Sequence, residues 1–380
     1  MTEMITFSLD GRDVAAKPGE TIWDVAKRHG TDIPHLCHKD QTGYRADGNC
    51  RACVVEVDGE RTLAASCCRN PANGMVVKTA SERATKARAM VVELLLADQP
   101  TRLEAHDYSS HLWDMADASG VSESRFPKLA EGHIPLLDDS HVAMRVNLDA
   151  CIQCGLCVRA CREVQVNDVI GMAGRGHDAY PTFDFADPMG DSTCVACGEC
   201  VQACPTGALM PATVLDADQR GDRADIDREV TSVCPFCGVG CQVSLKIKDG
   251  KVKYVEGING PANEGRLCVK GRFGFDYIHH PHRLTKPLIR KEGAPKGLNV
   301  DPANALTHFR EATWDEALDF AAKGFSSLKD KDGGRAVAGF GSAKCSNEEA
   351  YLFQKLIRQG FGHNNVDHCT RLCHASSVAA

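Results

Sequence analysis

Residues 151–161 read CIQCGLCVRAC, and residues 194–204 read CVACGECVQAC. Cysteines occupy the first, fourth, seventh and last positions of both stretches, so all four match in register. Such agreement between two separate segments is not a structural accident. The repeat predicts that residues 148–210 form one domain whose fold is organised around eight thiol groups.

The spacing C-x2-C-x2-C-x3-C, with Pro205 after the second run, resembles that of bacterial two-cluster ferredoxins. In that family the fourth cysteine of each run binds the cluster that the other run holds. The resemblance implies one [4Fe–4S] cluster on Cys151, Cys154, Cys157 and Cys204. It implies a second on Cys194, Cys197, Cys200 and Cys161. The first run departs from the pattern at Arg162, where a proline is expected, but it keeps all four thiolates.

The composition is that of a multidomain globular protein with an excess of cysteine. The chain has 380 residues, of which 43% are hydrophobic and 25% charged. The formal charge of −7 and the lack of a basic run give no reason to expect nucleic-acid binding. The first ten residues have no secretory pattern, so the twenty cysteines favour metal ligands in a cytoplasmic protein. The most apolar run, residues 90–97, is too short for the roughly 20 residues of a membrane span.

Residues 1–79 have the pattern of a small β-rich domain. Ile5, Phe7 and Leu9 alternate with polar residues, as in a strand. Thr21 is a candidate N-cap for a short helix that Gly30 ends. The pair Asp58-Gly59 between two apolar runs indicates a hairpin.

This domain carries a first cysteine group, formed by Cys37, Cys50, Cys53 and Cys67. Four thiolates suit a [2Fe–2S] cluster, because each iron needs two of them. The spacing resembles the β-grasp ferredoxin domain in the large iron–sulfur subunit of complex I, in which the loop around Gly48 wraps the cluster tightly. A structural zinc site is the alternative, since four cysteines also suit zinc. Cys68 is interpreted as a spare thiol.

Residues 80–147 form a helical connector in this interpretation. The stretch Ser81–Ala97 predicts an amphipathic helix with Ser81 as N-cap. Relatives of complex I often carry H-x3-C-x2-C-x5-C here, which holds a further cluster. Counted from His106, the cysteine positions of that motif are Ser110, Trp113 and Ser119, so we expect this cluster to be absent even though His106 and His111 remain.

The third cysteine group lies in residues 231–285, after a polar and acidic stretch, residues 211–230, interpreted as a linker. It consists of Cys234, Cys237, Cys241 and Cys268. The spacing resembles the N-terminal [4Fe–4S] domain of the molybdopterin oxidoreductases, and a zinc ribbon would place its cysteines in two C-x2-C pairs. In that family a lysine two residues after the last cysteine lies between cluster and pterin, which implies this role for Lys270; a solvated surface lysine is the alternative.

Residues 286–380 predict the beginning of an α/β domain. Ala336–Phe340 has the pattern of a buried strand, residues 341–343 of a turn, and Ser346–Gln359 of a helix. That helix contains NEE at residues 347–349, and GHNNVDHCTRLCHASS follows at residues 362–377.

The order of these motifs resembles molybdopterin formate dehydrogenases. The resemblance implies that Cys373 is the thiolate ligand of molybdenum and that His374 positions substrate or accepts a proton. A buried cysteine next to a core histidine is the alternative. Cys345 and Cys369 are interpreted as structural.

Taken in order, the segments predict an α+β multidomain protein. It comprises a β-grasp [2Fe–2S] domain, a helical connector, a two-cluster ferredoxin domain, a small [4Fe–4S] domain and the start of a molybdopterin domain, residues 286–380, that we expect to continue further. This series resembles the N-terminal portion of the α subunit, the catalytic one, of soluble NAD-dependent formate dehydrogenases. The resemblance implies one [2Fe–2S] cluster, three [4Fe–4S] clusters and molybdenum bis-molybdopterin guanine dinucleotide, whose binding needs the rest of that domain.

The implied function is oxidation of formate to CO2, with electrons carried through the clusters. NAD does not accept single electrons, so a flavin is required, and the sequence has no convincing G-x-G-x-x-G motif. A flavin- and NAD-binding partner subunit is therefore expected, and the resemblance implies a small iron–sulfur subunit as well. The alternatives are an electron-transfer module of another molybdopterin oxidoreductase, such as a nitrate reductase, that is inactive alone, and a zinc-stabilised scaffold.

Overall fold

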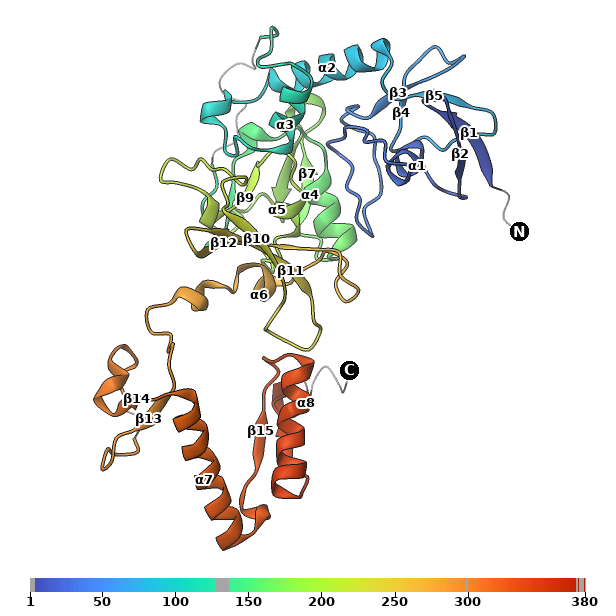
Figure 1. Ribbon diagram of the computed structural model, residues 1–380. Helices are drawn as coiled ribbons and strands as arrows, with labels where there is room; N and C mark the ends of the chain where they lie inside the picture. The colour runs from blue at the N-terminus through green and yellow to red at the C-terminus, as the bar shows by residue number, and fades with distance from the viewer. Residues whose placement is uncertain (1–3, 128–136, 298–299, 374, 376–378, 380) are drawn as a thin grey trace.

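The computed structural model describes residues 4–127, 137–297, 300–373, 375 and 379. Cysteine-bearing domains pack around one another in the first three quarters of the chain, and the last segment extends from them with its long helix outermost (Figure 1). Within the described ranges, no helix is both long enough and apolar enough to cross a membrane.

The first domain is a five-stranded sheet with one helix. Its strands are β1 (Ile5–Leu9), β2 (Arg12–Ala16), β3 (Val54–Val57), β4 (Ala64–Ala65) and β5 (Val76–Lys78), in the order β2-β1-β5-β3-β4. Helix α1 (Ile22–Arg28) begins at the predicted cap, where Thr21 and Asp24 form a capping box. The antiparallel pairing of β3 with β4 confirms the hairpin at Asp58-Gly59.

The connector packs into the core of the next domain. Helix α2 (Glu82–Leu96) is capped by Ser81, as predicted, and α3 (His111–Ala118) follows. Trp113 is buried, and the fully buried His106 lies with its Nδ1 2.7 Å from the Gly207 carbonyl oxygen. The stretch 211–230 also packs here, since the Gly221 N–H donates to the His106 carbonyl at 3.0 Å.

The eight-cysteine domain has two equivalent halves. Each cysteine run ends in a short helix, α4 (Leu156–Arg159) or α5 (Glu199–Ala203). Strand β6 (Met144–Val146) pairs with β9 (Leu209–Pro211), and β7 (Ile170–Ala173) pairs with β8 (Tyr180–Phe183). Leu156, Met144 and Leu209 fill the shared core together with Leu112 of the connector.

A three-stranded antiparallel sheet carries the third cysteine group. Its strands are β10 (Arg228–Val233), β11 (Gln242–Lys248) and β12 (Lys251–Gly257), and α6 (Val269–Phe273) packs beside β12. Asp249 and Gly250 both have positive φ, which is the geometry of a tight hairpin between β11 and β12.

The last segment contains a parallel β-α-β unit. Strands β13 (Leu288–Arg290) and β14 (Phe309–Glu311) precede helix α7 (Trp314–Asp332). Strand β15 (Gly339–Gly341) then pairs in parallel with β16 (Val366–His368) across α8 (Asn347–Lys355), and α9 (Thr370–Cys373) follows. The predicted strand Ala336–Phe340 is therefore displaced, because Gly334–Ala336 forms a 3-10 turn. The predicted helix begins correctly after Ser346 and changes into a π-helical turn at Leu356.

Helix α7 has no buried side chain, and Trp314 is 69% exposed. We expect limited chymotrypsin digestion to cut first at Trp314 or at the neighbouring exposed aromatic residues of α7. Trp113, 5% exposed, and Trp23, 3% exposed, serve as internal controls that stay intact. Mass spectrometry of the first fragments reads the cut sites, and an early cut beside Trp113 or Trp23 would contradict this arrangement.

Candidate metal centres

The first cysteine group is buried and consists of two close pairs, Cys37 with Cys50 and Cys53 with Cys67. The Cys37 N–H donates to the Cys50 sulfur at 3.3 Å, the Cys50 N–H donates to the Cys37 sulfur at 3.4 Å, and the sulfurs of Cys53 and Cys67 are 3.4 Å apart. All four side chains are buried. A hydrogen bond from Cys37 lowers the pKa of the Cys50 thiol to about 7. One from Cys67 lowers the pKa of Cys53 to about 6, so both pairs provide a thiolate near neutral pH.

The loops of the eight-cysteine domain curl so that backbone N–H groups face sulfur. Gln153 and Ala196 occupy the same position in the two runs, and both have positive φ, of 57° and 54°. Their N–H groups donate to the sulfurs of Cys151 and Cys194 at 3.4 and 3.3 Å. Non-glycine residues adopt this conformation only when the surroundings enforce it. The backbone is thus strained in a way that favours thiolates, which is the form that binds iron.

The structure brings the last cysteine of each run to the other run. Burial raises the pKa of Cys157 well above its ordinary value, and the charges of Cys151, Cys154 and Cys204 raise it further. Burial likewise raises the pKa of Cys200, with further increases from Cys197, Cys194 and Cys161. The neighbours of Cys157 and Cys200 thus agree with the spacing, and the assignment of the eight cysteines as cluster ligands stays a prediction. Uncompensated thiolates would repel one another here, so the groups suit a positively charged iron centre.

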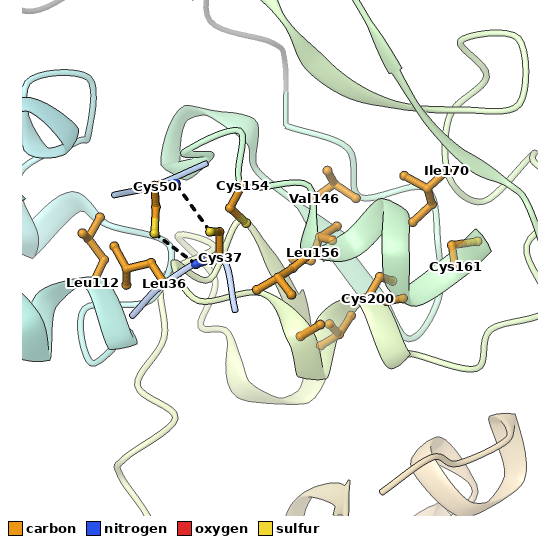
Figure 2. Close-up of a cluster of buried hydrophobic side chains, with 14 of the residues drawn as sticks. Leu36, Cys37, Cys50, Leu112, Val146, Cys154, Leu156, Cys161, Ile170 and Cys200 are labelled. Carbon is orange, nitrogen blue, oxygen red and sulfur yellow. Dashed lines mark hydrogen bonds between the residues drawn. The ribbon is translucent and has the colours of Figure 1, made fainter. Parts of the chain in front are cut away.

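The first three sulfur groups lie in series. Cys154 is close enough to Cys37 for the charge of one to raise the pKa of the other, an effect that adds to burial. Figure 2 shows Cys37 and Cys50 facing each other with Cys154 beside them. Cys157 and Cys200 are coupled in the same way, which links the two groups of the eight-cysteine domain.

The third cysteine domain holds its group at the surface of a smaller core. Burial raises the pKa of Cys241, and the neighbouring Cys234, Cys237 and Cys268 raise it further. A Cβ on Gly271 would lie 3.4 Å from the Cys234 sulfur, so the start of α6 passes close to the group. Lys270 is exposed on α6.

In the described part of the chain, no three His, Cys, Asp or Glu side chains close around a single ion position.

A cavity of about 480 Å³ opens at the carboxyl ends of β15 and β16, where parallel sheets commonly bind ligands. It is lined by Ser342, Cys345, Glu349 and His368, among others. His368 Nε2 lies 2.8 Å from the Ser342 carbonyl oxygen. Glu349 and His368 belong to the stretches 347–349 and 362–377 that the sequence analysis singled out, whereas Ser342 and Cys345 lie outside them.

Of the predicted molybdenum residues, the structure describes the backbone of Cys373 alone. Cys373 is the last residue of α9, and its side chain is not among those described. His374 lies outside the described residues. Helix α8, which lines the cavity, contacts the loop that carries the third cysteine group, because Asn347 Nδ2 donates to the carbonyl of Gly238, next to Cys237, at 2.7 Å.

The cysteines outside the predicted ligand sets have local contacts. The exposed Cys68 lies with its sulfur 3.7 Å from that of Cys67. Cys345 donates to the Ser342 carbonyl, and Cys369 accepts from the Ala343 N–H. None of these three joins a group of four.

Gly155 and Gly198 offer a matched test of the two halves. Both have positive φ, so alanine costs about 1 kcal/mol at either position. A Cβ on Gly198 would also lie 2.1 Å from Arg272 Cδ, whereas one on Gly155 meets only Asn49, at 3.9 Å. We expect Gly198→Ala to lose another 3 kcal/mol or so, because it displaces a buried ion pair. Thermal unfolding of the iron-loaded protein measures the difference, and equal melting temperatures would contradict this packing.

Four family descriptions match consecutive parts of the chain. A 2Fe-2S iron–sulfur cluster binding domain matches residues 2–82, and a 4Fe-4S dicluster domain matches residues 150–208. The molybdopterin oxidoreductase Fe4S4 domain matches residues 227–280, and the molybdopterin oxidoreductase domain matches residues 283–380. The order agrees with the predicted series.

Similar proteins extend along the whole chain. "Putative formate dehydrogenase YrhE" of Bacillus subtilis (strain 168) is 31% identical over 98% of this chain. "Putative formate dehydrogenase SH0748" of Staphylococcus haemolyticus (strain JCSC1435) is 30% identical over 100% of it. The chain spans 40% of the length of either relative. The crystal structure of an NAD+-reducing [NiFe]-hydrogenase in the H2-reduced state is 31% identical, covers 55% of this chain and 87% of that chain, and has a TM-score of 0.49. The chain is thus similar to iron–sulfur domains over residues 2–82 and 150–208 and to molybdopterin oxidoreductase domains over residues 227–280 and 283–380.

Proposed function

We propose that the complete protein oxidises formate to CO2 at a molybdenum centre and passes the electrons through its cysteine groups to a partner. The observation that carries this proposal is the proximity of the first three sulfur groups, which interact electrostatically from Cys37 to Cys154 and from Cys157 to Cys200. The relatives named for formate dehydrogenase activity support the choice of substrate.

The proposed cofactor set is one [2Fe–2S] cluster, three [4Fe–4S] clusters and a molybdenum bis-molybdopterin guanine dinucleotide. Sixteen cysteines serve as iron ligands: Cys37, Cys50, Cys53, Cys67, Cys151, Cys154, Cys157, Cys161, Cys194, Cys197, Cys200, Cys204, Cys234, Cys237, Cys241 and Cys268. The clusters supply one-electron chemistry when bound, and the molybdenum centre supplies the two-electron oxidation. In this proposal the further cluster expected of complex I relatives is absent, because Ser110, Trp113 and Ser119 have no thiol.

The chain's own residues have separate tasks. Cys373 binds the metal through its thiolate, and His374 positions formate or takes a proton. Lys270, exposed on α6 next to the third cysteine group, supplies a positive charge toward the pterin. The N–H groups of the loops donate to the sulfurs of Cys50, Cys151 and Cys194 and thereby favour their ionised form.

The proposed partners are a flavin- and NAD-binding subunit and a small iron–sulfur subunit, in the cytoplasm. The β-grasp group is suited to the exit of electrons, because it stands at the end of the series opposite to the cavity. The alternative is an electron-transfer module of another molybdopterin oxidoreductase. It would have the same sulfur groups, and its electrons would come from a substrate other than formate.

Formate should bleach the iron–sulfur absorbance of the full-length complex, purified without oxygen. Cys373→Ser should slow this bleaching at least a thousandfold, because a thiolate ligand of the metal is lost, while NADH still bleaches the clusters through the partner. Stopped-flow absorbance measures both rates.

Cys369→Ser is the matched control, since Cys369 is exposed and four residues away. It should leave formate bleaching within threefold of the unaltered protein. Bleaching by NADH and never by formate in the unaltered complex would reject formate as substrate and favour the electron-transfer module.

A further inference from the structure

Two of the junctions between sulfur groups are each crossed by one buried arginine. Arg159, at the end of α4, is 1% exposed, and Arg272, on α6, is 3% exposed. Arg159 lies within the first cysteine run and Arg272 four residues after Cys268, but neither is needed as a metal ligand. Burial of a guanidinium is costly, so each must be held by several partners.

Arg159 joins the first cysteine group to the eight-cysteine domain. Its Nη2 donates to the carbonyl oxygens of Cys37, at 2.8 Å, and Cys154, at 3.0 Å. Its Nε lies 3.1 Å from a carboxylate oxygen of Asp47. One guanidinium therefore bridges the backbones of two cysteines that belong to neighbouring groups.

Arg272, on α6 of the third cysteine domain, extends its guanidinium to the second cysteine run. The side-chain Nε of Arg272 donates to the Cys197 carbonyl at 2.6 Å. The backbone N–H of Arg272 donates to the Cys268 carbonyl at 3.1 Å. Its Nη2 donates to Glu199 Oε2 at 3.1 Å. Glu199 is fully buried between Cys197 and Cys200 in the chain.

The Glu199 carboxylate is also the meeting point of three domains. Tyr44 of the first domain donates to it at 2.9 Å, and the Lys39 ammonium lies 3.6 Å away. Arg272 Nη1 donates to Gln202 Oε1 at 2.6 Å, which completes the fork. The ion pair between Arg272 and Glu199 is thus held by further partners of both side chains, beside the sulfur group that contains Cys194.

We propose that Arg159 and Arg272 are positioning residues that tune the one-electron relay: each holds two adjacent sulfur groups together and stabilises the reduced state of the clusters beside it. This inference rests on the proposed function. Reduction adds one electron and no proton to a cluster, so its negative charge rises by one. The guanidinium stays positively charged, and charge interactions are strong in a buried site. The Glu199 carboxylate, which pairs with Arg272, has the opposite effect, because its negative charge disfavours the reduced state.

The test is a dithionite titration of the full-length, anaerobically purified protein, followed by electron paramagnetic resonance. Arg272→Gln should lower the midpoint potential of the cluster on the Cys194 group, and Glu199→Gln should raise it. Arg159→Gln should lower the potentials of the two clusters beside Arg159. Each shift should change the ratio of reduced to oxidised cluster at least tenfold at a fixed potential, or 59 mV for one electron.

Charge-conserving variants separate tuning from a purely structural role. Arg159→Lys and Arg272→Lys keep the positive charge and lose the forked guanidinium. The ratio of reduced to oxidised cluster at a fixed potential should therefore stay within threefold of that in the unaltered protein. Arg45→Gln is the control for Arg159, because Arg45 also pairs with Asp47 but its side chain is 63% exposed. Arg266→Gln is the control for Arg272, since it also crosses domains, to the Thr42 carbonyl.

The outcomes distinguish failure of this inference from failure of the proposed function. Opposite shifts for Arg272→Gln and Glu199→Gln would support the inference, and Glu199→Gln supplies the test if the arginine variants do not fold. Unchanged potentials in a protein that carries its clusters would overturn the inference alone. Absence of iron–sulfur signals from the unaltered protein would overturn the proposed function together with it.

Discussion

The exchange of the last cysteine between the two runs is the constraint on which the rest of the structure depends. Neither run completes a group of four, because Cys161 lies with the second run and Cys204 with the first. The two halves must therefore fold around each other, and their short helices share one core. The β-grasp loop and the connector pack against that core, so the position of the first cysteine group follows from it.

Electrostatics explain why these groups need an occupant. Burial and mutual repulsion raise the pKa of Cys157 and Cys200 far above the ordinary thiol value. Iron would reverse this balance, since a bound cation favours the thiolate. Ligand loading and folding are then coupled, as in other small metal-binding domains. The strained backbone at Gln153 and Ala196 is stabilised in the same way, through N–H groups that face sulfur.

Sequence patterns predicted the elements whose cause is local. Caps at Thr21 and Ser81 begin helices as expected, and a helix begins after Ser346. The cysteine spacing agrees with the neighbours of Cys157 and Cys200, and the cluster assignment stays a prediction. The strand near residue 338 was displaced because glycines beside it favoured a 3-10 turn. Arg159 and Arg272 could not be predicted, since their partners are carbonyl groups and carboxylates far away in the chain. Contacts to backbone atoms leave no residue-type pattern in the sequence.

The metal content of the purified protein tests the central claim most directly. Quantitative iron, zinc and acid-labile sulfide analysis, together with Mössbauer spectroscopy, should be made on protein prepared without oxygen. The account predicts about fourteen iron atoms per chain and an equal amount of sulfide, divided between one [2Fe–2S] and three [4Fe–4S] clusters. About four zinc atoms per chain, with no sulfide, would contradict it, because the cysteine groups would then be structural sites and no electron relay would exist.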